Sequence, residues 1–312
     1  FLFKLDGGVP KPLPQDVAGY FDYAPRDLAS AIRQEIALAL QQFGIKVEAS
    51  HHECAVGQHE IDFEYADALR TADNAVTFKH TVKSVAYQHD MYATFMPKPI
   101  FGIAGSGMHV HQSLFDKKGS NAFFDSKDKY HLSDVARHFV AGQLEHIKGI
   151  SAVLSPTVNS YKRLVHGYEA PVYICWAQRN RSALIRIPRY TPGKEKAVRA
   201  ELRCPDPSAN PYTAFALMLA AGLDGIKNKT EPPAPVEEDV YKFDDSRLKE
   251  LGMATLPVDL GHAIELFKDS RLAKDTLGPH AFDYYLAGKK AEWREYRMHV
   301  SDWEVNRYLK LL

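Results

Sequence analysis

The chain has 312 residues, of which 45% are hydrophobic and 25% charged, a composition typical of a globular protein with a large buried core. Lysine plus arginine equals aspartate plus glutamate at 39 each, and this neutral balance argues against a broad basic surface for nucleic acid or an anionic membrane. Three scattered cysteines without a CxxC pair argue against a disulfide framework or structural zinc and favour a reducing, cytoplasmic setting, and no apolar run is long enough to span a membrane.

The first third of the chain predicts two helices around two short strands. Strands are expected over residues 45–50 and 60–65, and a helix over residues 66–87. An earlier helix is expected over residues 25–44, because a glycine ends this segment and its apolar side chains recur at helical spacing, at Leu28, Ile32, Ile36 and Leu40.

The rest of the chain mixes strands and helices without a βαβ rhythm, which favours an α+β fold over a doubly wound sheet. A helix in two pieces is expected over residues 132–154, and residues 210–229 form a helix with Asn210 as N-cap and Pro211 in the first turn. The C-terminal part is mostly helical. Further strands are expected over residues 91–99, 106–115, 181–188 and 197–205.

Residues 51–60, HHECAVGQHE, concentrate groups that bind protons or metals. Glu53 and Glu60 are an odd number of residues apart, so on one continuous strand they would face opposite sides. Gly57 lies between them, where a turn can reset the alternation and direct both carboxylates to one point. Such carboxylates suit magnesium or manganese, and a solvated turn with ordinary charged residues is the alternative.

The segment GSGMHVHQS carries His109 and His111 on one face of a predicted strand. The glycines before it do not form a dinucleotide site, because such a site needs a helix after the glycines and a strand pattern follows here. The chain also lacks a GxxxxGK[ST] motif, which excludes a Walker-type loop. Partly buried, hydrogen-bonded histidines are the alternative to a binding role.

The segment AVRAELRCP alternates, with Glu201 between Arg199 and Arg203 on one face of a half-buried strand. The three residues form either a surface ladder of ion pairs, which contributes little, or a metal-binding carboxylate beside phosphate-binding arginines. The middle third of the chain is rich in further arginines, which together with the carboxylates and histidines suggest metal-assisted phosphoryl transfer to a small charged substrate. These arginines are Arg163, Arg179, Arg181, Arg186 and Arg189.

Six motifs occur in one order: HHECAVGQHE, GSGMHVHQSL, NSYKRLVHGYEAP, RNRSALIRIP, AELRCPDPSANPY and AGLDGIKNK. Together they resemble the bacterial and archaeal type of glutamine synthetase, over essentially the whole chain. The resemblance implies one catalytic domain over residues 1–312, α+β, with a mixed, mainly antiparallel curved sheet surrounded by helices. The family's N-terminal β-grasp domain and Glu-x-Glu strand are expected to lie outside this stretch, which by itself is expected to be poorly active.

The resemblance also implies a site residue by residue. Two divalent cations, Mg²⁺ or Mn²⁺, are expected, with Glu53 and Glu60 on the first and His109 and Glu201 on the second. For the amino acid, the resemblance implies Arg163 on the α-carboxylate, Gly105 in the substrate loop, and Glu169 as the flap residue that takes a proton from ammonium. Arg181 and Arg203 match arginines on the transferring phosphoryl group and the γ-carboxylate, and the positions that match nucleotide contacts are His111, Ser113, Lys196 and Arg199.

The implied reaction is the ATP-dependent ligation of ammonia to the γ-carboxylate of glutamate through γ-glutamyl phosphate. Two departures from the family pattern, Ala104 in the substrate loop and His166 in the flap, lie on the amino-acid and ammonium side. A γ-glutamylpolyamine synthetase is therefore the alternative enzyme, and a regulatory member without activity is the alternative outside catalysis. The family further implies a cytoplasmic homo-oligomer of twelve subunits in two six-membered rings.

Overall fold

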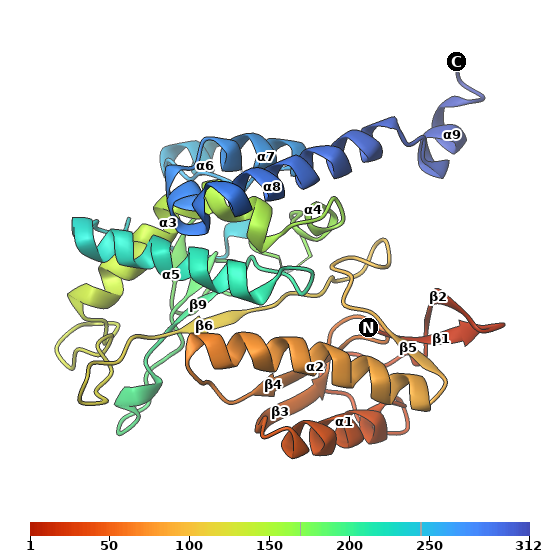
Figure 1. Ribbon diagram of the computed structural model, residues 1–312, viewed down its shortest axis with the longest axis horizontal. Coiled ribbons are helices and arrows are strands. Elements are labelled where there is room, and N and C mark those ends of the chain that lie inside the picture. Colours follow the sequence, from red (N-terminus) through yellow and green to blue (C-terminus); the bar gives the residue numbers. More distant parts are fainter. Residues whose placement is uncertain (169, 244) are drawn as a thin grey trace.

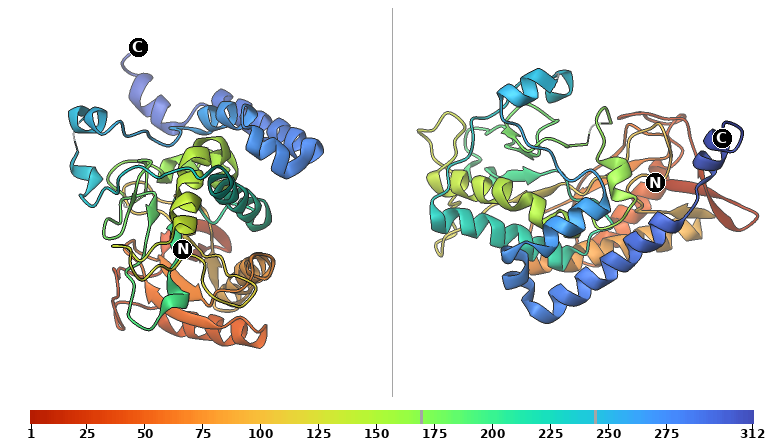
Figure 2. Two further views of the ribbon diagram at one scale, coloured as in Figure 1. Left: turned by 90° about the vertical axis from the view of Figure 1, so that its left-hand side faces the viewer. Right: turned by 90° about the horizontal axis from the view of Figure 1, so that it is seen from above.

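The computed structural model describes residues 1–168, 170–243 and 245–312 (Figures 1 and 2). Helices α1 and α2 with the first strands form one side of the molecule, and helices α3, α5, α7 and α8 form the other (Figure 1). The strands β6 and β9 lie between these two parts (Figure 1). The C-terminal α9 projects beyond the body of the molecule (Figure 1). In the described part of the chain, no helix is both long and apolar enough to cross a membrane.

The N-terminal part holds two small antiparallel sheets. The first has the order β2-β1-β5, with β1 (Leu2–Asp6), β2 (Val9–Pro14) and β5 (Met91–Ala93). The second is the hairpin of β3 (Val47–His52) and β4 (His59–Phe63). Helices α1 (Ser30–Gln42) and α2 (Ala68–Gln88) bury an apolar face against these strands, with Ile32, Ile36, Leu40, Val82 and Val85 in the shared core.

The third sheet has four strands in the order β6-β9-β8-β7, antiparallel except for the parallel pair β7–β8. Its strands are β6 (Val110–Gln112), β7 (Trp176–Ala177), β8 (Ile185–Arg186) and β9 (Ala200–Leu202). The larger helices around it are α3 (Asp134–Leu154), α5 (Pro211–Asn228), α7 (Leu260–Lys268) and α8 (Arg271–Met298). Shorter elements are α4 (Ser160–Arg163), η1 (Glu195–Ala197), η2 (Val240–Lys242), α6 (Asp245–Glu250) and α9 (Asp302–Tyr308).

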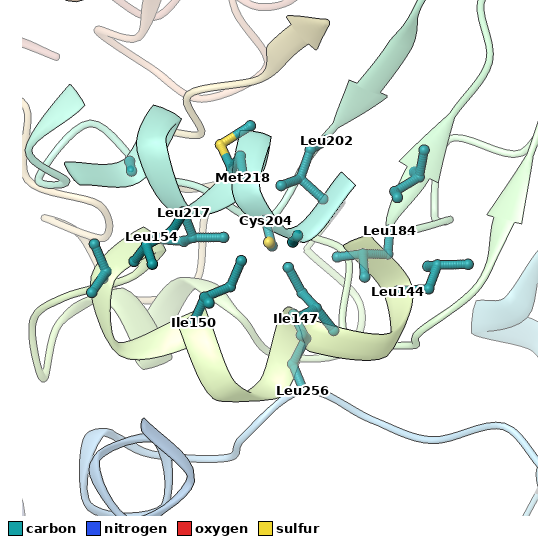
Figure 3. Close-up of a cluster of buried hydrophobic side chains, with 14 of the residues drawn as sticks. Leu144, Ile147, Ile150, Leu154, Leu184, Leu202, Cys204, Leu217, Met218 and Leu256 are labelled. Atoms are coloured by element: carbon teal, nitrogen blue, oxygen red, sulfur yellow. The ribbon is translucent and has the colours of Figure 1, made fainter. Parts of the chain in front are cut away.

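The main core lies where α3 and α5 cover this third sheet. Figure 3 shows Leu144, Ile147, Ile150 and Leu154 of α3 meeting Leu217 and Met218 of α5, and Leu184, Leu202 and Cys204 from the sheet side. The two helices approach closely, because a Cβ added to Gly142 would lie 2.2 Å from the carbonyl oxygen of Ala221. This packing fixes β9, and therefore Glu201, from behind.

The α+β prediction is confirmed, although the strands form three separate small sheets. Asn210 caps α5 as predicted, accepting from the N–H groups of Tyr212 and Thr213. Gly44 ends α1 with a positive φ of 74°, and the following N–H, of Ile45, donates to the carbonyl of Leu40, as in a Schellman motif.

Two local expectations were wrong. Residues 134–154 form one continuous helix instead of two pieces. The apolar stripe predicted for the first helix also begins too early, because Leu28 precedes α1 and is exposed.

Candidate active site

The β3–β4 hairpin brings Glu53 and Glu60 together. His51 pairs with Glu60 across the hairpin, and Gly57 forms the turn with a positive φ of 67°. Ligand atoms of His51, Glu53 and Glu60 all lie within 4.8 Å of one another. The Nε2 atom of His51 is 3.3 Å from Oε1 of Glu53 and 3.9 Å from Oε2 of Glu60. The glycine therefore allows the arrangement that the sequence suggested, and His51 joins it.

The two carboxylates of this hairpin repel each other. Desolvation, the hydrogen bond with Glu53 and the charge of Asp62 raise the pKa of Glu60 to about 9. Burial also acts to raise the pKa of Glu53, but hydrogen bonds from Glu60 and from the backbone of Cys54 outweigh it and leave that pKa lowered. The two carboxyl groups thus titrate as a pair that holds one shared proton. A divalent cation between the carboxylates would replace this proton, so the donor set fits such an ion.

An aromatic pair that the sequence analysis missed covers this cluster. The ring of Phe21 stacks on His51 with centroids 4.4 Å apart, and Tyr20 meets the same imidazole edge-on at 5.5 Å. The backbone N–H of Phe21 donates to the carbonyl of His52, which fixes the segment to the hairpin. No spacing pattern in residues 18–23 could have indicated this contact, because it depends on the tertiary fold.

The second group centres on Glu201, which is 2% exposed in the middle of the third sheet. Its Oε2 accepts from Nε of Arg186 at 2.5 Å, and its Oε1 accepts from Nη1 of Arg203 at 2.5 Å. The Nδ1 atom of His109 lies 3.5 Å from the same Oε1. Burial acts to raise the pKa of Glu201, but the nearby cationic groups outweigh it and the net pKa is lowered.

The expected half-buried strand is therefore wrong in one respect. β9 lies between β6 and β8, so both of its edges are paired. Successive residues Ala200, Glu201 and Leu202 are all buried, so neither face of the strand is open to solvent, and Arg203 is buried as well. The alternative of a solvent-exposed ladder of ion pairs is excluded by this burial. Arg186, to which the resemblance assigned no individual role, lies opposite Glu201 in the β8–β9 pair. The Nε atom of Arg203 is buried without a hydrogen-bond partner among the described residues, so it is free to donate to an anion.

The imidazoles beside this group are neutral. Desolvation, with the cations Arg203 and Arg163, holds the pKa of His109 well below its ordinary value, which leaves a lone pair for a metal. Desolvation also lowers the pKa of His111 to about 4, with Arg199 acting in the same direction and Glu201 opposing it. The Nε of Arg199 donates to Nδ1 of His111 at 2.9 Å. His111 and Arg199 thus form a hydrogen-bonded pair in which Arg199 carries the positive charge.

The other two residues predicted to contact the nucleotide lie on neighbouring loops. Ser113 follows β6 and is half-buried, whereas Lys196 is exposed on the 3₁₀ helix η1. The loop around η1 is held by a residue that the sequence analysis missed: the Nδ2 atom of Asn121 lies within 3.2 Å of the carbonyl oxygens of Glu195, Lys196 and Val198. This contact positions the Lys196 backbone relative to the sheet.

Comparisons with known proteins identify the family of the chain. The family model for the glutamine synthetase catalytic domain matches residues 7–308. This chain belongs to the glutamine synthetase family. Glutamine synthetases of Clostridium saccharobutylicum and Methanosarcina mazei are 55% and 53% identical to it, covering 99% and 100% of this chain and 69% of each relative. A solved GmaS–ADP complex superposes with a TM-score of 0.89 at 36% identity, covering 99% of this chain and 71% of that one. The resemblance stated from the motifs is thereby confirmed.

In this glutamine synthetase chain, Arg163 joins the two groups of the site. Its guanidinium is buried, with Nη1 donating to the backbone carbonyl of Cys204 and Nη2 to that of Arg203. Gly105 and Gly107 pack against its side chain, since a Cβ at either position would lie within 3.2 Å of Arg163 atoms. A substrate carboxylate held by Arg163 would therefore share donors that the backbone already uses.

A hydrogen-bond path connects the hairpin to the substrate loop. Gln58, in the β3–β4 turn, donates from Nε2 to the carbonyl of Gly105 at 3.0 Å and accepts from the Ala55 N–H. Gly105 contacts Arg163, whose guanidinium contacts the backbone next to Glu201. The two carboxylate groups therefore belong to one continuous set of contacts.

The flap residues are placed only in part. Glu169 lies outside the described residues, and Arg181 is exposed on the loop between β7 and β8. His166 lies beside the rings of Tyr173 and Tyr241, at centroid distances of 6.2 and 5.2 Å. Ala104 packs against the small apolar cluster of Phe1 and Phe3. An apolar Ala104 thus suits its surroundings without a hydrogen-bonding side chain.

Proposed function

We propose that this chain forms the catalytic domain of a glutamate–ammonia ligase. It joins ammonia to the γ-carboxylate of L-glutamate and releases ADP and phosphate. The observation that carries this function is 53–55% identity to two glutamine synthetases over essentially the whole chain. The carboxylate hairpin and the Glu201 cluster, connected through Gln58 and Arg163, support it.

Glutamine synthetases use ATP and divalent Mg²⁺ or Mn²⁺, and the donor groups fit such ions to different degrees. Glu53 and Glu60, with His51 beside them, would hold one cation, because their ligand atoms converge and their shared proton is the group that an ion replaces. His109 and Glu201 would hold the second, although both oxygens of Glu201 already accept from arginines. The bound cations supply Lewis-acid stabilisation of phosphate oxygens.

In the first half-reaction, an oxygen of the glutamate γ-carboxylate attacks the γ-phosphorus of ATP. The bond to ADP breaks and γ-glutamyl phosphate forms, which turns a poor leaving oxide into phosphate. Arg203, with its free Nε, and Arg186 would stabilise the charge that develops on the transferring group. The hydrogen-bonded pair Arg199–His111, with Ser113 and Lys196 on the adjoining loops, holds the nucleotide phosphates.

In the second half-reaction, ammonia attacks the activated carbonyl and phosphate leaves. We assign Arg163 and Gly105 to the amino-acid end of glutamate, Glu169 to the proton taken from ammonium, and Arg181 to the phosphoryl group and γ-carboxylate. Because γ-glutamyl phosphate hydrolyses readily, the flap must exclude water while ammonia reacts.

The acceptor can be tested directly. With glutamate, ATP and Mg²⁺, ADP release should depend on glutamate, and the product with ammonium should be glutamine. Methylamine and putrescine should support far lower kcat/KM than ammonium. A higher kcat/KM with either amine would identify an amine ligase, and ADP release without any ligated product would reject ligase function.

We further propose that the enzyme is a cytoplasmic homo-oligomer of two stacked six-membered rings. The exposed apolar side chains of the projecting C-terminal segment, among them Trp303, Leu309 and Leu311, support contacts between copies of the chain. Sedimentation of the intact enzyme should give the mass of twelve subunits, and a monomer under assay conditions would contradict this assembly.

A further inference from the structure

A buried polar network lies behind the hairpin that carries Glu53 and Glu60. Its centre is Asp16, which follows β2 and is 6% exposed. Oδ1 of Asp16 accepts from the Gly57 N–H at 3.0 Å and lies 3.1 Å from Nε2 of His52. Oδ2 accepts from Nε2 of Gln15 at 2.9 Å. Nδ1 of His52 is 2.7 Å from the carbonyl oxygen of Glu53. Asp16 therefore contacts the hairpin at both sides of its turn.

The donor and acceptor roles follow from the contacts. A carbonyl oxygen accepts only, so His52 donates from Nδ1 to Glu53. Gly57 and Gln15 donate to Asp16, and Nε2 of His52 lies 3.1 Å from Oδ1 of the same carboxylate. His52 is fully buried, so this pair of contacts is shielded from water and holds the Glu53 backbone in one place.

The same cluster contains His59 and so offers the residue types of a metal site, but the contacts argue against one. Nη1 of Arg33 lies 2.9 Å from Nδ1 of His59, and a guanidinium can only donate. Nε2 of His59 in turn lies 2.8 Å from Nε2 of Gln15, so both ring nitrogens already contact other polar groups of the protein. The positive charge of Arg33 also disfavours a cation at this position. The network is consequently a support for the hairpin.

The turn tolerates little movement around this support. A Cβ on Gly57 would lie 2.9 Å from Oε1 of Gln15 and 3.0 Å from the carbonyl oxygen of Leu2. Glu53 follows His52 directly, and Glu60 follows Gly57 by three residues, so both carboxylates leave the backbone next to atoms that Asp16 holds. A shift in the position of Asp16 would therefore move the carboxylates of both Glu53 and Glu60.

We propose that Asp16 and His52 are positioning residues that set the separation of Glu53 and Glu60 and thereby the affinity of the hairpin for a divalent cation. This inference rests on the proposed function, since it assumes that Glu53 and Glu60 bind the ion. Residues that orient metal ligands typically contribute a factor of about 10 to 100 to metal affinity. Asp16 supplies this support from outside the hairpin, to both sides of the turn.

The test is a Mn²⁺ titration of the intact enzyme, followed by the electron paramagnetic resonance of free Mn²⁺. Asp16→Asn should weaken the affinity of the hairpin site by about 10 to 100 times. His52→Asn retains an amide donor near the Glu53 carbonyl but loses the contact with Asp16, and should weaken it comparably. In the double variant the losses should be far from additive, because the two residues act through each other.

Asp128→Asn is the matched control. Asp128 is also largely buried, accepts from the N–H groups of Tyr130 and Leu132, and pairs with Arg137, but it lies outside this network. It should lower the melting temperature and leave Mn²⁺ affinity unchanged.

Three outcomes separate the hypotheses. If Asp16→Asn fails to fold, His52→Asn alone decides, and an unchanged Mn²⁺ affinity in that variant overturns the inference. Additive losses, or folded variants that differ from Asp128→Asn only in melting temperature, overturn it as well. If Glu53→Gln leaves Mn²⁺ binding intact in the otherwise native enzyme, the hairpin does not bind the metal. The inference about Asp16 and His52 then fails because its premise is wrong, an outcome that the Asp16 and His52 variants alone would not give.

Discussion

Glu201 provides a quantitative test of the electrostatics in the third sheet. The change Glu201→Gln keeps the shape of the side chain and removes the charge that Arg186 and Arg203 share. Glu201 is 2% exposed, and the side chains of Arg203 and Arg186 are 9% and 26% exposed. Breaking a buried pair by neutralising one partner costs about 3–5 kcal/mol. We expect about 3 kcal/mol here, at the lower end of that range, because glutamine can still accept from one arginine and Arg186 is partly exposed.

The assay is guanidinium-induced unfolding of the enzyme without metal or nucleotide, followed by tryptophan fluorescence. Glu265→Gln is the control, because Glu265 pairs with Lys268 on an exposed helix face, and it should change the free energy of unfolding by less than about 0.5 kcal/mol. If Glu201→Gln destabilises the protein no more than this control does, the two arginines are compensated by something other than Glu201 and the charge argument is wrong.

Three further predictions concern other parts of the molecule. The pKa of Glu60 is about 9 in the folded protein against an ordinary 4.5, so the metal-free protein should lose stability as pH rises from about 5 to 9. The rise in melting temperature with Mg²⁺ should accordingly be larger at pH 8.5 than at pH 6, and Glu60→Gln should abolish that difference. Gly142→Ala places a methyl group against the backbone of Ala221, so urea unfolding should show a loss of at least about 3 kcal/mol, and a neutral result would contradict the close helix approach. Asn121→Ala removes the hydrogen bonds that hold the loop carrying Lys196. The loss of about 1 kcal/mol should raise the KM for ATP roughly fivefold, while the KM for glutamate stays constant. Equal changes in both KM values would show that this loop does not act specifically on ATP binding.

Local signals predicted the elements that local physics determines. The Asn210 cap followed by Pro211 marked the start of α5, and Gly44 marked the end of α1, because both contacts are made within a few residues. Gly57 likewise predicted the turn that directs Glu53 and Glu60 to one side.

Tertiary contacts explain the expectations that failed or were missing. α3 runs through Gly149 without a break, and this glycine leaves room for Ser270, because a Cβ there would lie 2.9 Å from the Ser270 hydroxyl. Alternation in β9 could not distinguish an edge strand from a central one, so the burial of Glu201 and the role of Arg186 appeared only once the strand order was known. Asp16 had no motif, since its partners lie about 36 to 41 residues away.

The central claim is that the γ-carboxylate of glutamate is activated by phosphoryl transfer in this site. Glutamate labelled with ¹⁸O in the γ-carboxylate, incubated with the enzyme, ATP, Mg²⁺ and ammonium, tests it by mass spectrometry of the released phosphate. Each phosphate should carry one ¹⁸O atom, and one glutamine should form per ADP. Phosphate that carries no ¹⁸O would contradict it, because the oxygen would then have come from water.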